Sequence, residues 1–264
     1  MVSGGRYFES TFDGDYLTGV LIIGSVTVLY TFIGGFLAVS YTDVVQGTLM
    51  FLALLIVPVL ALFALNDPSD ILTWPTEQPY GPWENGNPDY FNLVAGVSAA
   101  TIIGNLAWGL GYFGQPHIVT RFMALRSPAQ AKTARRTGTI WVFICYVGAV
   151  LTAMVSTAYF GQKSASVTDQ EGFETVFLDL ARIMFHPLIA GIVLTAVLAA
   201  IMSTMSSQLL VTSSALIEDL YRIVNKNPSQ TSLLVLSRTM VVVIALIGML
   251  MALNPSDTIL GLVG

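Results

Sequence analysis

Hydroxyl side chains gather in the middle of one long apolar stretch. Residues 183–217 contain no Asp, Glu, Lys or Arg, which predicts a helix that crosses a membrane. Ala200, Ser203 and Thr204 stand at i, i+3 and i+4, so a helix places them on one face within a turn of each other. Two hydroxyl oxygens and a backbone carbonyl are ligands that suit a small hard cation stripped of its water. The spacing therefore predicts a cation site.

A packing interpretation of the same residues stays open. Ser and Thr are common where membrane helices approach each other closely, and their hydroxyls often bond to the carbonyl four residues earlier. The residue types alone do not separate packing from cation binding.

The composition predicts an all-α integral membrane protein. Hydrophobic residues make up 54% of the 264 residues and charged residues only 10%, whereas a soluble domain is about a quarter charged. Six charge-free runs are each long enough to cross a hydrocarbon core, which takes about 20 residues. They are residues 16–42, 44–66, 90–120, 137–162, 183–217 and 239–256, and we expect about six transmembrane helices.

The basic residues predict the orientation of these helices. Eight lie in two loops, namely Arg121, Arg126, Lys132, Arg135 and Arg136 in one, and Arg222, Lys226 and Arg238 in the other. Only Arg6, Lys163 and Arg182 fall on the opposite side. Cytoplasmic loops carry the excess of Lys and Arg, which places the N-terminus outside and residues 121–136 in the cytoplasm. The sequence contains no basic patch of the kind that binds nucleic acid.

A glycine pair separates the first two spans. Gly34 and Gly35 predict a tight turn, so these spans should form an antiparallel hairpin. We expect Asp43 to complement the helix dipole at the inner end of span two, which leaves no charged residue at mid-membrane depth. The two histidines, His117 and His186, fall on opposite sides of the membrane. Since phosphate-loop, HExxH and GxSxG motifs are also missing from the sequence, an enzyme is not expected.

The third span is predicted to be interrupted. Three glycines and Pro116 follow one another closely at its end, and both residue types weaken a helix. Interrupted membrane helices are where transporters bind substrate. Trp108 and Tyr112 are four residues apart and could wall one side of a small apolar pocket, although a close helix crossing explains the glycines equally well. Further on, residues 171–184 predict an amphipathic helix on the outer face.

Three long blocks of sequence carry a family resemblance: YTFIGGFLAVSYTDVVQGTLM (residues 30–50), WGLGYFGQPHIVTRFMA (residues 108–124) and AGIVLTAVLAAIMSTMSSQLLVTSSALIEDLY (residues 190–221). They closely resemble the sodium/solute symporter family, and within it the sodium/proline symporters. The likeness runs in order through nearly the whole chain. It implies a LeuT-type bundle built from two inverted five-helix repeats.

The resemblance also implies a division of the chain. Residues 1–66 would be the last two helices of repeat one, residues 67–92 an extracellular loop, and residues 93–264 the first four helices of repeat two with the start of the next helix. The N- and C-terminal helices of the same transporter would then be missing. Among them are the first two helices of repeat one, which supply the remaining sodium ligands and the rest of the pocket.

The family's site residues carry over onto matching positions. Sodium would bind the carbonyl of Ala200 and the hydroxyls of Ser203 and Thr204. Proline-binding positions fall on Trp108, Tyr112 and Pro116, whereas Asp43 and Gln46 are interpreted as structural.

The function so implied is sodium-coupled symport of L-proline into the cell by alternating access, in the full-length protein. Sodium would be the coupling ion, with no organic cofactor, and the location would be the lipid bilayer of a bacterial cytoplasmic membrane. Two alternatives stay open: a sodium symporter for another small organic solute, and a structural or sensory membrane module that does not transport.

Overall fold

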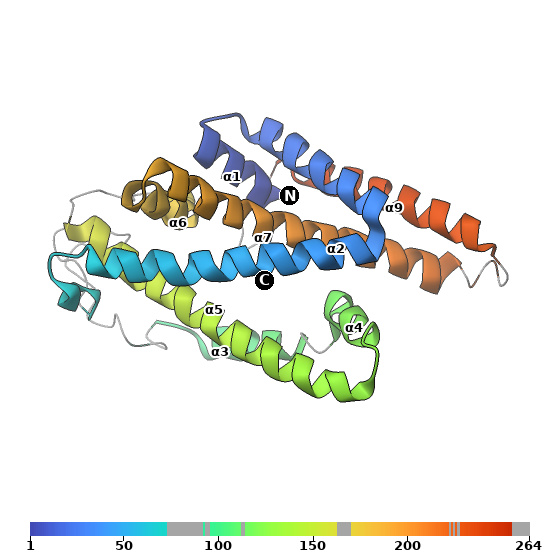
Figure 1. The fold of residues 1–264 in the computed structure, drawn as a ribbon, viewed down its shortest axis with the longest axis horizontal. Helices are drawn as coiled ribbons and strands as arrows, with labels where there is room; N and C mark the ends of the chain where they lie inside the picture. Colours follow the sequence, from blue (N-terminus) through green and yellow to red (C-terminus); the bar gives the residue numbers. More distant parts are fainter. Residues whose placement is uncertain are drawn as a thin grey trace. The chain divides into compact units, whose positions relative to one another are not determined.

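The regular elements in the described part of the chain are all helical, as predicted. The computed structural model describes residues 1–72, 92, 96–111, 114–162, 170–221, 223, 225 and 228–254. In chain order the elements are α1 (Val2–Phe12), α2 (Tyr16–Phe63), η1 (Pro68–Leu72), α3 (Ala99–Gly111), α4 (Pro116–Met123), α5 (Pro128–Gln162), α6 (Gln170–Met184), α7 (Pro187–Ser214), η3 (Ala215–Tyr221, π-helical) and α9 (Gln230–Met251) (Figure 1). They form two compact units, Met1–Ala53 with Gln170–Gly264, and Leu54–Asp169.

Helix α2 turns back on itself at one residue. Gly35 has φ 58° and ψ −158°, a conformation that is open essentially only to glycine. Tyr30 and Asp43, on either side of it, bond to the consecutive residues Met202 and Ser203 of α7. Thirteen residues of straight helix would span roughly 20 Å, so the helix must reverse between them. The corner predicted at the glycine pair is confirmed, and we call residues 16–34 the first arm and residues 36–63 the second arm.

Helix α1 packs on α7 in the first unit. No helix was predicted here, because this stretch is polar and rich in glycine. Its Tyr7 is nevertheless 4% exposed, and the Tyr7 hydroxyl donates a hydrogen bond to the carbonyl of Leu194, 2.9 Å away. Arg182 of α6 donates to the carbonyl of Ser10, near the end of α1. Tertiary contacts therefore hold this helix.

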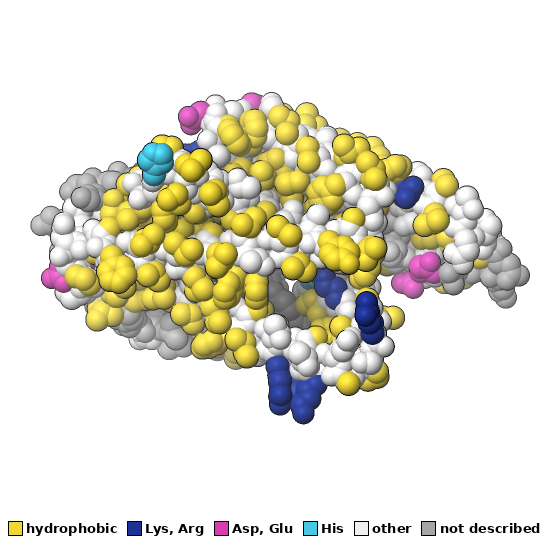
Figure 2. Space-filling model, viewed as in Figure 1, with side chains coloured by type: hydrophobic (Ala, Val, Ile, Leu, Met, Phe, Trp, Pro, Cys, Tyr) yellow, Lys and Arg dark blue, Asp and Glu magenta, His cyan; other side chains and the backbone are white. Residues whose placement is uncertain are grey.

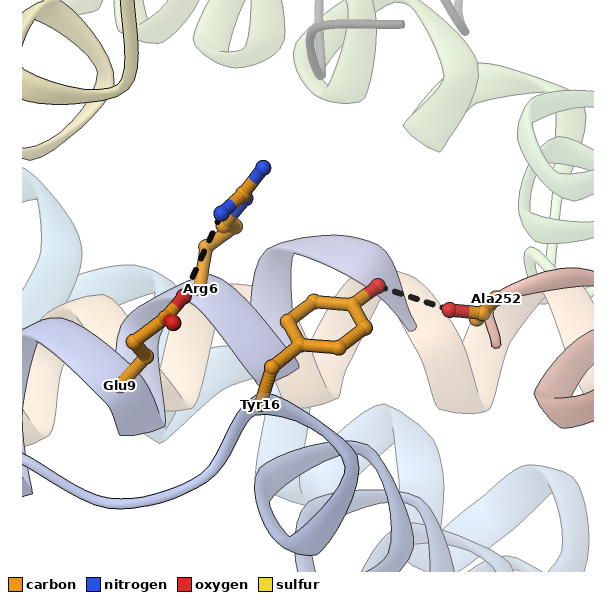
Figure 3. A network of polar contacts seen from close by, with 4 residues as sticks. All are labelled: Arg6, Glu9, Tyr16 and Ala252. Atoms are coloured by element: carbon orange, nitrogen blue, oxygen red, sulfur yellow. Dashed lines mark hydrogen bonds and ion pairs between the residues drawn. The ribbon is translucent and has the colours of Figure 1, made fainter. Parts of the chain in front are cut away.

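Polar contacts tie the start of α2 to α1 and α9 (Figure 3). The Tyr16 hydroxyl donates to the carbonyl of Ala252, which caps α9, over 2.9 Å. The Arg6 guanidinium lies 5.6 Å from the centre of the Tyr16 ring and pairs with Glu9 at 3.3 Å. The ring of Tyr16 thus contacts Arg6 of α1, and its hydroxyl bonds to the end of α9.

The predicted amphipathic helix is present as α6. Its Leu178, Leu180 and Ala181 are buried, and the helix contacts both α1 and α7. The apolar face is therefore covered by protein, whereas the sequence alone suggested a helix lying on the outer face of the membrane.

Four helices in the described part of the chain are long and apolar enough to cross a membrane: Tyr16–Phe63, Pro128–Gln162, Pro187–Asp219 and Gln230–Met251. The first holds predicted spans one and two, and the others are spans four, five and six. Span three is not among them, because α3 has only 13 residues and ends at Gly111. Hydrophobic side chains cover most of the face seen in Figure 2, as a lipid-facing surface requires. Basic side chains gather near α4 and the start of α5.

In the second unit, Gln162 joins the end of α5 to the segment that follows α2. Its Oε1 accepts a hydrogen bond from the backbone N–H of Asn66 over 2.8 Å. Its Nε2 donates to the Asp67 carbonyl over 3.1 Å and to the Asp70 carboxylate over 2.7 Å. The hydroxyl of Ser69 also bonds to the Asp67 carboxylate, which lowers the pKa of that group.

Candidate functional site

Helix α7 carries the residues predicted to bind a cation. It begins with Pro187, which suits the first helical position because proline lacks an N–H there. The imidazole of His186 accepts a hydrogen bond from the backbone N–H of Leu188 over 3.4 Å. Helical geometry then continues to Ser214 without a break, so the hydroxyls of this helix are held at fixed helical positions.

The hydroxyls on α7 fall into two groups. Thr204 donates to the carbonyl of Ala200 over 3.1 Å, and Ser206 donates to the carbonyl of Ser203 over 3.0 Å. Such bonds to the preceding turn are what the packing interpretation expects. Ser203 and Ser207 point elsewhere, toward a carboxylate on α2. Both therefore take part in contacts between helices.

That carboxylate belongs to Asp43, on the second arm of α2. Its Oδ1 lies 2.5 Å from the Ser203 hydroxyl and its Oδ2 lies 3.4 Å from the Ser207 hydroxyl. The two serines are four residues apart, so a helix presents them on one face, one turn above the other. Asp43 thus bridges two successive turns of α7.

This position of Asp43 corrects the expectation for it. Ser203 is the middle residue of the 33-residue span Pro187–Asp219, and the Asp43 carboxylate bonds to it. Asp43 is not at the start of its helix, because the second arm begins next to Gly35, about two turns earlier. The expectation that no charged residue reaches the middle of a span was therefore wrong. The sequence signal is that Asp43 is the one charged residue between residues 16 and 66.

A cavity of about 470 Å³ runs along another side of α7. Ala200, Thr204, Gln208 and Thr212 line it at successive four-residue steps, and Ser3 of α1 adds a further polar side chain. The opposite wall includes Ile244 and Gly248 of α9. The structure thus brings two of the three predicted ligands, Ala200 and Thr204, to this cavity. Ser203 instead bonds to Asp43.

Two further polar side chains of α2 lie near this part of α7. The Tyr30 hydroxyl donates to the Met202 carbonyl over 2.9 Å. Gln46 follows Asp43 by one turn, and its buried Oε1 has no hydrogen-bond partner among the described residues. A buried unpaired carbonyl is costly, so an acceptor is available for a donor or a cation here.

The predicted substrate residues lie in the second unit. The helical geometry is broken at Gln115, whose backbone is extended and which caps α4 at Pro116, and this confirms the predicted break. Pro116 is exposed and follows Gln115, the N-cap of α4. Trp108 lies in α3, but its side chain is outside the described residues, as is all of Tyr112. The predicted aromatic wall therefore stays a prediction.

The chemistry available on α7 is coordination by oxygen. Hydroxyls, a backbone carbonyl and a carboxylate lie within two helical turns, and these groups suit hard cations. Within the described residues, no cluster of three His, Cys, Asp or Glu side chains could hold a metal ion.

Comparison with known proteins gives matches along the whole chain. The chain is 47% identical over 265 residues to the osmoregulated proline transporter OpuE of Bacillus subtilis, covering 100% of this chain and 52% of that protein. It is 46% identical over 264 residues to the high-affinity proline transporter PutP of the same organism, covering 100% and 54%. For the sodium/proline symporter of Staphylococcus aureus, the identity is 41% over 267 residues, covering 100% and 50%.

The chain thus spans about half the length of the curated relatives it matches. A family model described as the sodium:solute symporter family matches residues 1–264. Because that match includes every residue of the sequence, the chain belongs to the sodium:solute symporter family.

Proposed function

We propose that this chain forms part of a sodium-coupled symporter that imports L-proline by alternating access. The observation that carries the proposal is the oxygen-rich middle of α7, with the Asp43 carboxylate 2.5 Å from Ser203. The names of the relatives, all proline transporters or sodium/proline symporters, favour proline over another small solute. They also favour transport over a structural or sensory module.

Sodium is proposed to bind the Ala200 carbonyl and the Ser203 and Thr204 hydroxyls, as coupling ion and cargo. The Asp43 carboxylate adds the negative charge that a neutral oxygen site lacks. In the structure, two hydroxyls partly offset the cost of burying this charge. A cation beside Ser203 would offset it further, so its binding would strengthen the attachment of the second arm to α7.

Proline is proposed to bind where Trp108, Tyr112 and Pro116 surround the interruption between α3 and α4. The extended backbone at Gln115, before the new helix begins at Pro116, frees backbone groups. Those groups can meet the ammonium and carboxylate of an amino acid. Coupling is then a reciprocal free energy, since sodium raises proline affinity by the factor by which proline raises sodium affinity.

The wider arrangement is proposed to follow a LeuT-type bundle in a bacterial cytoplasmic membrane, with the N-terminus of this chain outside. Residues 1–66 would close the first repeat and residues 93–264 would open the second. The basic residues around α4 and the start of α5 support a cytoplasmic position for that end. The remaining half of the length of the relatives would supply further sodium ligands.

Uptake of labelled L-proline into membrane vesicles tests this function. The chain, and a version extended at both ends to the length of its relatives, are compared with and without a sodium gradient. We expect uptake only by the extended protein and only with sodium. Uptake by the 264-residue chain alone would contradict the need for further helices, and uptake that ignores sodium would contradict symport.

Ser203→Ala and Thr204→Ala in the extended protein separate cation binding from packing. Both should raise the sodium concentration for half-maximal uptake sharply. Thr195→Ala is the matched control, because Thr195 is an exposed α7 hydroxyl that bonds only back to the Gly191 carbonyl. An unchanged sodium requirement in both site variants would favour the packing interpretation.

A further inference from the structure

A second hollow lies between the first arm of α2 and α9, which run side by side (Figure 1). This α2–α9 groove has a volume of about 360 Å³ and is apolar except for Ser25. Val28, Leu29 and Phe32 line it on α2, and Val242, Leu246 and Met249 line it on α9. Both helices are candidate membrane spans, so the groove lies at the depth of the hydrocarbon of the bilayer. An apolar chain is the chemistry that fits it.

The groove has a cationic end. On α9, Arg238 precedes Val242, Leu246 and Met249 by four, eight and eleven residues, so it lies on the same helix face. Its guanidinium carbon is 5.8 Å from the centre of the Phe32 ring, at the α2 wall of the groove. The cation–π contact holds the positive charge at this end.

Arg238 also lies where lipid headgroups are expected. It immediately precedes the charge-free run 239–256, and Phe32 lies just before the corner at Gly35. Phe32 is therefore near the end of the first arm, and Arg238 lies at the border of the charge-free part of α9. Arg238 is exposed and has no carboxylate partner among the described residues. A basic residue between two membrane helices at the headgroup level is a typical contact for an anionic lipid.

We propose that the α2–α9 groove binds one anionic glycerophospholipid. An acyl chain lies between Leu29 and Leu246, and the phosphodiester accepts hydrogen bonds from Arg238. A bare hydrocarbon would leave the guanidinium unpaired, and a zwitterionic lipid would bring its own cation close to it. Charge complementarity thus selects a lipid with a net negative headgroup. The proposal does not depend on which solute is transported.

Native mass spectrometry of the extended protein tests the proposal. After delipidation, the protein is offered equal amounts of phosphatidylglycerol and phosphatidylcholine, and the lipid retained is counted. We expect one phosphatidylglycerol to be retained in preference. Arg238→Gln should reduce this preference roughly fivefold, which is the effect of one basic residue near an anionic surface. Val242→Phe should fill the groove and reduce retention of both lipids.

Two matched variants control for charge and for size. Arg136→Gln removes an equal charge from the start of α5, and Val243→Phe adds the same ring on the neighbouring exposed face of α9. Both should retain phosphatidylglycerol as the parent protein does. The proposal is overturned if Arg238→Gln keeps the full preference, or if both lipids are retained equally. It is also overturned if the parent protein retains neither lipid. That result is expected if a helix from the rest of the extended protein covers the groove.

Discussion

Neutralising Asp43 should weaken sodium coupling more than any other single acidic substitution in the described residues. The Asp43 Oδ1 is 2.5 Å from the Ser203 hydroxyl oxygen, and a hard cation sits about 2.4 Å from its oxygen ligands. A cation bound to Ser203 is therefore at most about 5 Å from the carboxylate. With an effective dielectric constant of about 20, this attraction is roughly 3 kcal/mol. Its loss corresponds to more than a hundredfold in sodium affinity.

Asp43→Asn is the variant to use, because the amide keeps the shape and can still accept a hydrogen bond from Ser203. The assay is proline uptake by the extended protein across a range of sodium concentrations. Asp67→Asn is the control, since Asp67 is an exposed carboxylate beyond the end of α2. A half-maximal sodium concentration within about twofold of the parent value, at equal expression, would refute the electrostatic reasoning.

Three further variants test the framework around the site. Tyr30→Phe removes the hydrogen bond to the Met202 carbonyl and should lower the free energy of unfolding by about 1 kcal/mol. An unchanged melting temperature would contradict this prediction. Gly35→Ala should lower the free energy of unfolding by about 1–3 kcal/mol because of backbone strain, although no atom lies within 4 Å of the added methyl group. Gly104→Ala is the control, because this glycine is equally open but helical, and it should not lower that free energy. Gln162→Leu removes three hydrogen bonds and should speed proteolysis after α2, so an unchanged cleavage rate would speak against this bridge.

Hydropathy and glycine placed most of the helices correctly from the sequence. The apolar runs correspond to α2, α5, α7 and α9, because lipid-facing helices must carry apolar side chains almost everywhere. The corner at Gly35 and the break before Pro116 were also predictable, since both depend on local backbone preferences. Helix α1 was not predictable, because its stability comes from contacts such as that of Tyr7 with Leu194.

The candidate site was only partly predictable. Successive residues on a helix point about 100° apart, so Ser203 and Thr204 can face different neighbours even though both lie within a turn of Ala200. Which neighbour each one meets depends on α2. The bond between Ser203 and Asp43 joins residues that are 160 positions apart in the sequence. A local sequence pattern cannot predict a contact over such a separation. The assignment of Ala200, Ser203 and Thr204 as sodium ligands stays a prediction, as does the aromatic wall of Trp108 and Tyr112.

The bonds from α2 to Met202 and Ser203 also limit how α7 can move. Both arms of α2 are attached to α7 at consecutive residues, one through a backbone carbonyl and the other through a side chain. A slip of α7 by one residue would shift it about 1.5 Å and turn it about 100°. Another backbone carbonyl would then reach Tyr30, but a slip that brings Met202 to the place of Ser203 would leave Asp43 without this hydroxyl. A slip in that direction is therefore disfavoured, and the middle of α7 and the corner of α2 should move together as one rigid body.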